Sequence, residues 1–410
     1  MIKNLKLKIA SFALIFASSL AFAFDFGGTA TNKSSLEKFN QENLQLNQKN
    51  SLSIWARQNF DKSAENYFAV EASYNFETDF FATDFANQTF TNALDFSLLK
   101  FTCTKNFDFG KFSFNAGRFY FSDLSEIVFS QNADGIKFDF QNDWIKTSIY
   151  SSYTGLLNAL TTEMITSPAT SFSFAQKIPV EDSQNAFSSD KIKVYDLAQK
   201  YLIAAFDFSL PNLIANQTVA LEYFAAFRLE GETFNRMYAS LNFNGPIYSS
   251  LFYDFVTSFG FTNCAGENKI SNLSKANLKY YFKNFSLGAN AIYASGNQGF
   301  LSTFQGFTKN TSTYSRQDFL YSGILKAGVN ASYKPITTLL LTFDCDTIFN
   351  ASAGNNFDGI EYFAFQYSLG ATWQIKSDFQ LGLSGTQFLD KENSNLARKS
   401  FVCLNAILAF

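Results

Sequence analysis

The side chains of this 410-residue chain that could do chemistry are charged residues and cysteines, because the chain has no histidine. Histidine is the usual general base, a common metal ligand and the base of Ser/His and Cys/His catalytic pairs. The four cysteines, at positions 103, 264, 345 and 403, have no spacing suited to zinc or to a disulfide framework. We therefore expect no enzyme activity, no cofactor and no metal site.

In several segments apolar and polar residues alternate, and the charged residues fall on the polar positions. There they would line a common water-filled space. The positive members are expected to be Arg57, Lys111, Lys137, Lys146, Arg228, Arg236, Lys275, Lys279 and Lys326. The negative members are expected to be Glu71, Asp95, Asp139, Asp207, Glu222, Asp254, Asp344 and Asp346. Nine positive against eight negative charges predict a nearly balanced pore wall with weak ion selectivity. A closed interior packed with paired charges is the alternative.

An alternation with a period of two would position these charges, and it extends over almost the whole chain. Between Phe68 and Phe76 the even positions are apolar, while the odd positions include Glu71, Ser73 and Asn75. The same pattern covers 218–228, 338–346 and 363–373. A period of two is typical of strands with one apolar face and one polar face.

The expected strands are longer than the roughly five or six residues usual in globular sheets, and they match the roughly 9 to 11 that cross a bilayer. Apolar faces rich in Phe and Tyr favour a lipid-facing wall over a soluble β-sandwich. The predicted fold class is therefore all-β, a transmembrane antiparallel β-barrel. Sixteen strands are the second choice if the segment with Gly27 and Gly28 is not a strand. The eighteen expected strands are 24–31, 50–58, 66–77, 94–104, 111–121, 134–141, 144–153, 199–209, 217–229, 234–244, 246–258, 272–282, 285–295, 320–333, 337–349, 360–374, 379–389 and 399–410.

Short and long connections alternate between these segments. Outer-membrane barrels have short periplasmic turns and long outer loops. The pattern predicts that residues 24–410 form one barrel with both termini in the periplasm. The tight turns are expected at 105–110, 141–143, 244–246, 283–284, 334–336 and 376–378.

The longest connection, 154–198, is expected to be an outer loop. A loop of this length is usually functional or disordered. Two interpretations remain open: it folds into the mouth and narrows the pore, or it stands outside as a surface that meets other cells. The loops at 259–271 and 296–319 are rich in Asn, Gly, Ser and Thr and are expected to be solvated.

Residues 1–23 have the features of a cleavable export signal. Lysines precede an apolar core at 9–20, and Ala21-Phe22-Ala23 is a small-x-small cleavage site. No later segment has the roughly 18 apolar residues that a membrane-spanning helix needs, which excludes helical transporters and receptors. We expect export to the bacterial outer membrane as an integral protein.

The C-terminal segment alternates up to a terminal aromatic residue through Leu404, Leu408 and Phe410. This pattern resembles the signal that the outer-membrane barrel-assembly machinery reads at the C-terminus of its substrates. The resemblance implies that these three residues form the assembly signal. It also implies that the assembly machinery and periplasmic chaperones are partners.

Ala116-Gly117-Arg118-Phe119-Tyr120-Phe121, followed by Asn132-Ala133-Asp134-Gly135-Ile136, resembles the Gly-Arg strand and following Asp-Gly strand start of Gram-negative porins. In those porins such an arginine commonly projects into the channel, so the resemblance implies that Arg118 lines the pore. The alternation along the strand instead places Arg118 on the same face as Phe112 and Phe114, unless a bulge at Gly117 shifts the alternation by one residue. The following loop, 122–133, is third in order, and in general porins the third loop constricts the channel.

Two classes of function remain open. A formal net charge of -3 without a basic tract argues against nucleic-acid binding. We expect a porin-like channel in the lipid bilayer for passive diffusion of small hydrophilic solutes. The alternative is a surface-exposed barrel that acts as an adhesin or host-interaction protein through its loops, and a homo-oligomer is compatible with either.

Overall fold

The computed structural model describes most of the chain from Phe24 onward. The predicted signal peptide 1–23 and most of the predicted loop 154–198 lie outside the described residues. Within the described part, no helix is long and apolar enough to cross a membrane. The described residues are 24–39, 43–81, 84–159, 164–165, 195–197, 199–297, 300–308, 321–351, 360–390 and 398–410.

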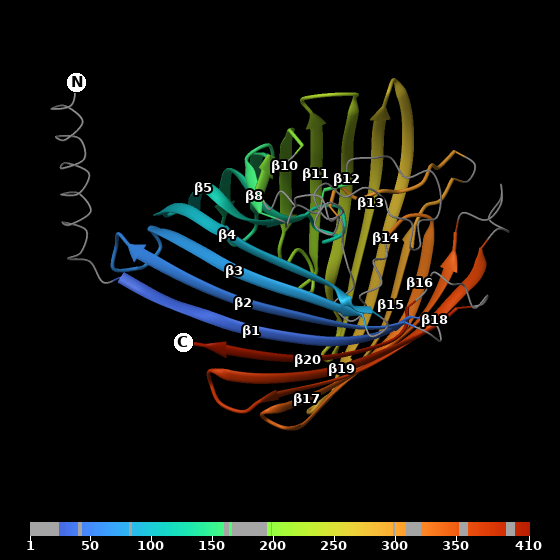
Figure 1. Ribbon diagram of the computed structural model, residues 1–410. Helices are drawn as coiled ribbons and strands as arrows, with labels where there is room; N and C mark the ends of the chain where they lie inside the picture. The colour runs from blue at the N-terminus through green and yellow to red at the C-terminus, as the bar shows by residue number, and fades with distance from the viewer. Residues whose placement is uncertain are drawn as a thin grey trace.

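Eighteen antiparallel strands form one closed barrel, and each strand pairs with its neighbours in chain order (Figure 1). The separate pair β8 (Leu157–Ala159) and β9 (Tyr195–Leu197) lies between β7 and β10 in the sequence. The barrel strands are β1 (Phe24–Phe39), β2 (Asn43–Asn59), β3 (Tyr67–Phe81), β4 (Asp84–Phe107), β5 (Gly110–Ser122), β6 (Ser130–Gln141), β7 (Lys146–Tyr153), β10 (Tyr201–Leu210), β11 (Thr218–Arg228), β12 (Phe234–Tyr248), β13 (Leu251–Cys264), β14 (Glu267–Tyr281), β15 (Phe285–Ala294), β16 (Ile324–Ile336), β17 (Leu339–Asn350), β18 (Glu361–Gln374), β19 (Phe379–Asp390) and β20 (Arg398–Ala409).

Alternation explains the two faces of this wall. On β18, Tyr367, Leu369 and Trp373 are exposed on the outside, whereas Gln366 and Ser368, on either side of Tyr367, are buried on the inside. Successive residues of a strand point to opposite faces, so every strand offers one apolar and one polar row. The outer wall is accordingly apolar and rich in aromatic rings. The predicted antiparallel barrel of eighteen strands is confirmed, and the sixteen-strand alternative is wrong.

The barrel closes where the two ends of the described chain meet, between β1 and β20. Beyond the paired strands, the N–H of Gly28 donates to the carbonyl of Phe410 at 2.8 Å, and the N–H of Phe410 donates to the carbonyl of Gly28 at 2.9 Å. The segment with Gly27 and Gly28 is therefore a strand after all. Glycine is needed because a Cβ on Gly28 would lie 2.6 Å from the Phe410 ring and 2.7 Å from the Ser53 carbonyl oxygen. Figure 1 shows the start of β1 and the C-terminus at the same end of the barrel.

Several predicted connections lie elsewhere. The expected turn at 244–246 is part of β12, and the turn to β13 is at 249–250. The expected turn at 334–336 is part of β16, and the turn to β17 is at 337–338. In both hairpins the register shifts next to a proline, Pro246 or Pro335, so an irregular end of the strand accommodates a residue that cannot donate to the ladder.

The predicted solvated loop at 259–271 is also wrong, because β13 and β14 continue through it to a tight turn at 265–266. Cys264, expected in that loop, is the last residue of β13. All four cysteines are free thiols.

Replacing Gly28 with alanine should weaken the closure of the barrel. The new Cβ would clash with a backbone carbonyl oxygen that cannot move freely, and overpacking of this kind costs about 1–3 kcal/mol. We expect the folded, fast-migrating species in unheated detergent gels to disappear at a lower temperature than in the wild type.

Gly382→Ala in β19 is the matched control, because its Cβ would have no neighbour nearer than 3.8 Å. Equal melting of the Gly28→Ala and Gly382→Ala barrels would contradict this account of the closure.

Candidate functional site

Three connections at the end of the barrel opposite the termini fold back into the lumen. They are the loop 123–129, the pair 164–165 and the segment 304–308. The N–H of Phe307 donates to the carbonyl of Val128 at 2.7 Å, and the N–H of Ile165 donates to the carbonyl of Phe307 at 2.9 Å. The prediction that 296–319 is a solvated loop is therefore wrong for 304–308. The third loop does enter the lumen, as the porin resemblance implied.

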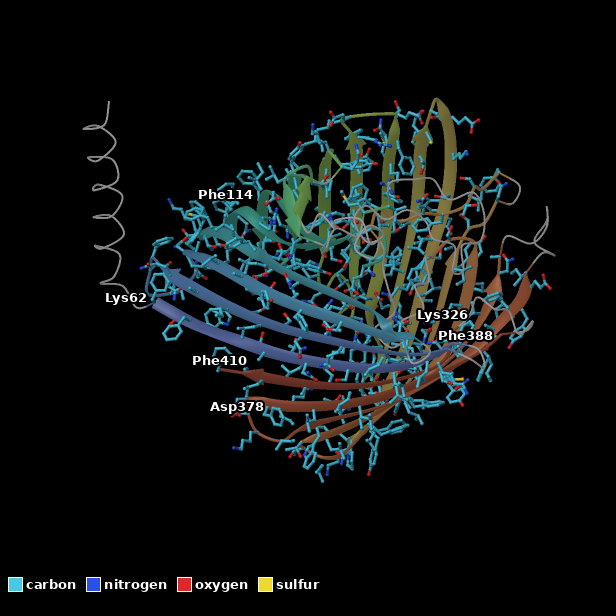
Figure 2. All side chains as sticks on the ribbon, viewed as in Figure 1. Lys62, Phe114, Lys326, Asp378, Phe388 and Phe410 are labelled. Atoms are coloured by element: carbon cyan, nitrogen blue, oxygen red, sulfur yellow. The ribbon has the colours of Figure 1, made fainter. Side chains whose placement is uncertain are left out.

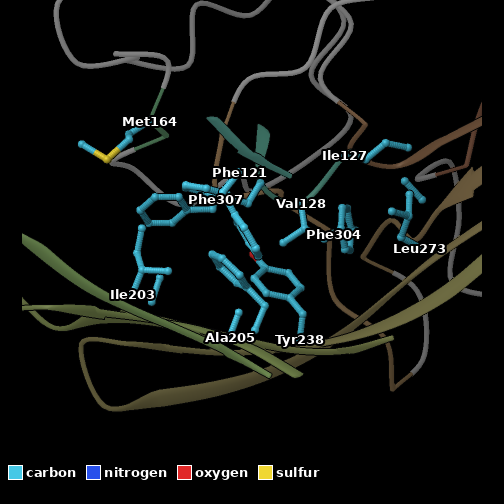
Figure 3. Packing of buried hydrophobic residues seen from close by; sticks show 14 of the residues in the cluster. Phe121, Ile127, Val128, Met164, Ile203, Ala205, Tyr238, Leu273, Phe304 and Phe307 are labelled. Atoms are coloured by element: carbon cyan, nitrogen blue, oxygen red, sulfur yellow. The ribbon is translucent and has the colours of Figure 1, made fainter. Parts of the chain in front are cut away.

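Apolar side chains join these segments to the inner face of the barrel (Figure 3). The ring of Phe129 lies 5.2 Å from Phe224 of β11 and 5.7 Å from Phe307, measured between centroids. We call this contiguous group the lumen cluster. Its buried members come from β5, β6, β7, β10, β11, β12, β14, β15, β16, β17, β18 and β19, and Leu98 of β4 packs against it. Among the described side chains, none from β1, β2, β3, β13 or β20 belongs to it.

Arg236 of β12 holds the segment 304–308 in place. The side chain is fully buried, and Nη1 donates to the carbonyl of Gly306 at 3.0 Å. Its guanidinium carbon lies 4.3 Å from the Phe234 ring centroid and 4.5 Å from that of Phe307. Cation–π contacts contribute about 0.5–1 kcal/mol at exposed sites and about 2 kcal/mol when desolvated, as here. The neighbouring Tyr238 hydroxyl donates to the carbonyl of Gln305 at 2.6 Å, so β12 binds the segment at two points.

Carboxylates fix the loop 123–129 in a similar way. The Asp123 carboxylate accepts the backbone N–H groups of Ser125 and Phe129, both at 2.8 Å. Burial raises the pKa of the Asp123 carboxyl, against the lowering effect of these hydrogen bonds. From β11, Glu222 Oε2 accepts the N–H of Leu124 at 3.0 Å, which joins the loop to the wall.

Seventeen of the eighteen residues predicted to line the pore lie on the inner face, as the registers of neighbouring strands show. Two ion pairs form among them: Lys137–Asp139 at 2.9 Å and Lys326–Asp346 at 3.0 Å. Figure 2 shows Lys326 toward the end of the barrel opposite Phe410 and Asp378. The inner-face residues are Arg57, Glu71, Asp95, Lys111, Lys137, Asp139, Lys146, Asp207, Glu222, Arg228, Arg236, Asp254, Lys275, Lys279, Lys326, Asp344 and Asp346.

Arg118 is the exception and faces outward. The register of β4 with β5 is continuous through Gly117, so no bulge resets the phase. Arg118 therefore shares the outer face with Phe112 and Tyr120. There its Nε and Nη2 bind the two carboxylate oxygens of Asp134 at 2.9 and 2.6 Å. A bidentate pair neutralises a charge that an apolar wall would disfavour.

Assigning faces by counting alternate residues in the sequence missed several charged residues of the inner face. Lys33, Glu37 and Lys49 lie beyond the predicted ends of the first two strands, and Glu77 is at the end of the third. Lys100 was missed for another reason: between Asp95 and Leu98 the strand β4 has one more residue than the facing segment of β3. Such a bulge reverses parity, so Asp95 and Lys100 both face inward.

Four adjoining strands outside the lumen cluster carry a mostly polar inner face, which we call the polar sector. It comprises the inner faces of β20, β1, β2 and β3, including Lys33, Lys49, Asn75, Glu77 and Asn405. Lys49 Nζ lies 3.6 Å from Glu77 Oε2, with 46% and 30% of the two side chains exposed. In contrast, the Lys326 and Asp346 side chains are only 15% and 7% exposed. Water therefore reaches the Lys49–Glu77 pair more freely than the Lys326–Asp346 pair behind the cluster.

A pocket of about 720 Å³ opens at the end of the polar sector near the termini. Its inner-face lining includes Trp55, Arg57, Tyr67 and Glu71. The Arg57 guanidinium carbon lies 3.9 Å from the Tyr67 ring centroid, and Glu71 Oε1 accepts from the Ser97 hydroxyl at 3.0 Å. The pocket therefore offers both signs of charge beside aromatic rings. Among the described residues, the pocket included, no group of three or more Asp, Glu or Cys side chains could hold a metal ion.

No family model and no curated protein matches this chain. Its fold is similar to three solved structures from Pseudomonas aeruginosa. OccK5 (OpdH) is 10% identical with a TM-score of 0.58, over 94% of this chain and 98% of that one. OccK11 (OpdR) is 11% identical with a TM-score of 0.57, over 95% and 97%. The outer membrane protein OprD is 11% identical with a TM-score of 0.56, over 94% and 93%.

Replacing Arg236 with methionine should release the segment 304–308 from the wall. Methionine keeps much of the volume but removes the donor to the Gly306 carbonyl and the charge between the two rings. We expect the backbone amides of 304–308 to exchange hydrogen faster by mass spectrometry in detergent.

Arg228→Met is the control, because Arg228 Nε binds the Glu230 carbonyl oxygen at the end of the same hairpin. Unchanged exchange at 304–308 in a folded Arg236→Met barrel would show that Arg236 does not hold this segment.

Proposed function

We propose that this protein is a porin-like channel of the bacterial outer membrane for passive diffusion of small hydrophilic solutes. One observation carries the proposal: a closed barrel with an apolar, aromatic outer wall has charged and polar residues along its inner face. An unpaired Lys or Arg on a lipid-facing wall costs about 2–4 kcal/mol at the midplane. The predicted lumen charges face inward, and the outward Arg118 is paired with Asp134, so the charge distribution favours a hydrated lumen. Barrels of this strand number leave an aqueous channel unless loops fill it.

The inward segments restrict where solutes pass. The lumen cluster occupies the side from β4 round to β19, whereas the polar sector carries the exposed Lys49–Glu77 pair. We infer that the aqueous passage follows the polar sector to the 720 Å³ pocket. The inner-face charges near this route are of both signs, which supports weak ion selectivity.

The lengths of the connections differ between the two ends of the barrel, and this difference supports an orientation of the barrel in the membrane. Connections on the side of the termini are short, including 108–109, 249–250 and 337–338. Phe109 and Trp144 are 62% and 74% exposed at this end, as in an aromatic girdle. We propose that this end faces the periplasm after cleavage of the signal peptide 1–23, and that the barrel-assembly machinery reads Leu404, Leu408 and Phe410 on the outer wall after periplasmic chaperones deliver the chain.

The alternative, an adhesin acting through its loops, needs loops that project outward. The segments 123–129 and 304–308 pack inward instead, with Val128, Phe129, Phe304 and Phe307 fully buried. Their burial favours the channel.

Charge replacement in β17 tests the channel. Asp344 and Asp346 both face inward, but Asp346 pairs with Lys326 and is nearly buried. We expect Asp344→Asn to shift the reversal potential in a salt gradient toward anions, because it removes a more accessible negative charge. Asp346→Asn should chiefly lower the melting temperature, since it leaves the Lys326 ammonium without its partner, a change that costs about 3–5 kcal/mol for buried pairs.

Asp378→Asn in an exposed turn is the control and should change neither property. Absence of conductance in both the wild type and a variant lacking 160–195 would refute the channel. Conductance only after that deletion would identify the loop as a plug.

A further inference from the structure

We propose that the outer faces of β1, β2 and β20 form a contact with a second copy of this chain within the membrane. The proposal rests on the membrane location proposed above. It starts from a group of polar side chains on the outer wall, Asn32, Ser34, Gln48 and Asn50, which we call the outer amide cluster.

The outer amide cluster lies across the β1–β2 pair, where Asn32 faces Asn50 and Ser34 faces Gln48. Asn32 Nδ2 donates to Asn50 Oδ1 at 2.7 Å, and the Ser34 hydroxyl donates to Gln48 Oε1 at 2.5 Å. Gln48 Nε2 approaches the same Asn50 oxygen at 3.4 Å. The side chains thus order one another into a ladder on the outside of the barrel.

Apolar rows lie on both sides of this ladder along the strands. On the side of the termini, Ala30 pairs with Leu52 and with Leu408 of β20. On the other side, Leu36 pairs with Leu46 and with Val402. The cluster is therefore inside the apolar band of the wall and not at a headgroup boundary.

The hydrogen bonds within the outer amide cluster leave some of its side-chain amide hydrogens without an acceptor. An amide group has two donors, and among the described residues Asn50 Nδ2 donates to none, while Asn32 and Gln48 use one each. Two hydrogens on Asn50 and one on each of the others make four donors without an acceptor. Acyl chains offer no acceptor, whereas polar side chains between packed transmembrane segments satisfy one another.

A second polar group on the outer wall shows the contrast. On β13 and β14, Asn272 Nδ2 donates both to the Thr257 hydroxyl at 3.2 Å and to the Ser258 carbonyl at 3.3 Å. The Ser274 hydroxyl binds Asn272 Oδ1 at 3.1 Å. Every amide hydrogen there has an acceptor in the same chain. Polar residues alone therefore do not distinguish the two groups, whereas the amide donors without an acceptor do.

The shape and chemistry of the surface select a second copy as the occupant. A hollow of about 480 Å³ beside the ladder is lined by Leu52, Tyr74, Phe76, Phe379 and Leu408, with Asn32 and Asn50 at its polar side. Amide groups are both donors and acceptors, so the ladder is complementary to itself. Copies inserted in the same orientation are related by an axis along the membrane normal, and a two-fold axis brings identical patches together.

Disulfide trapping in the outer membrane tests the contact. In a variant with the four native cysteines replaced by serine, Ala406→Cys places a thiol on β20 next to Asn32, and Ala276→Cys places one on β14 next to the satisfied group. We expect a covalent dimer after mild oxidation for Ala406→Cys and none for Ala276→Cys. Adding Gln48→Leu and Asn50→Leu should remove the dimer, whereas adding Asn272→Leu to the same Ala406→Cys protein should leave it.

Heat-modifiable migration and conductance of the same samples show whether each variant forms a working barrel. A conducting, membrane-located Ala406→Cys protein without dimer, or with dimer that survives Gln48→Leu and Asn50→Leu, overturns the contact and leaves the channel standing. Protein absent from the outer membrane overturns both. A lipid retained in native mass spectra of the monomer, and lost with Asn50→Leu, assigns the cluster to a lipid instead.

Discussion

Closure of the wall between β1 and β20 is the constraint on which the rest of the structure depends. In a bilayer, every backbone N–H and C=O must be paired within the protein, and a sheet meets this requirement only when it has no edge. The ladder from Thr29 and Ala409 to Phe39 and Arg398, extended by the two hydrogen bonds of Gly28, joins the first strand to the last. Once the wall is closed, each side chain must face either the outside or the lumen. The positions of the charges follow from that division.

This division explains why the fold was predictable from sequence. Alternation needs only the identity of successive residues, and the eighteen strands were placed because their apolar and polar rows repeat with a period of two. Residues such as Asp344 and Arg236 were assigned to the inner face for the same reason. Even Gly27 and Gly28, which weaken a strand signal, lie in β1, where they pair with β2 and the Trp55 and Phe410 side chains pack against them. Lengths at strand ends were underestimated, since Lys33 and Lys49 continue the pattern beyond the apolar rows.

The site was less predictable, because its geometry depends on contacts between distant segments. One extra residue near Ser97 reversed the parity of β4, and parity counting has no means of detecting it. The inward fold of 304–308 depends on Arg236 and Tyr238, about seventy positions earlier in the chain. Those loop residues look solvated by composition, yet Phe304 and Phe307 need an apolar environment. Arg118 shows a limit of motif resemblance. The resemblance to porins predicted that Arg118 lies in the channel, whereas the continuous strand register places it on the outer face.

The inward loops also give the wall two unequal parts. From β4 to β19 the lumen cluster supports the strands from inside, as packed side chains do in a protein interior. The strands β20, β1, β2 and β3 contribute no described side chain to that cluster, and their inner face is mostly polar. Those are the strands whose outer face carries the unsatisfied amides and the apolar hollow. A second copy packed there would support from outside the part of the wall that the loops leave unsupported. The same four strands would then serve the passage on one face and the assembly on the other.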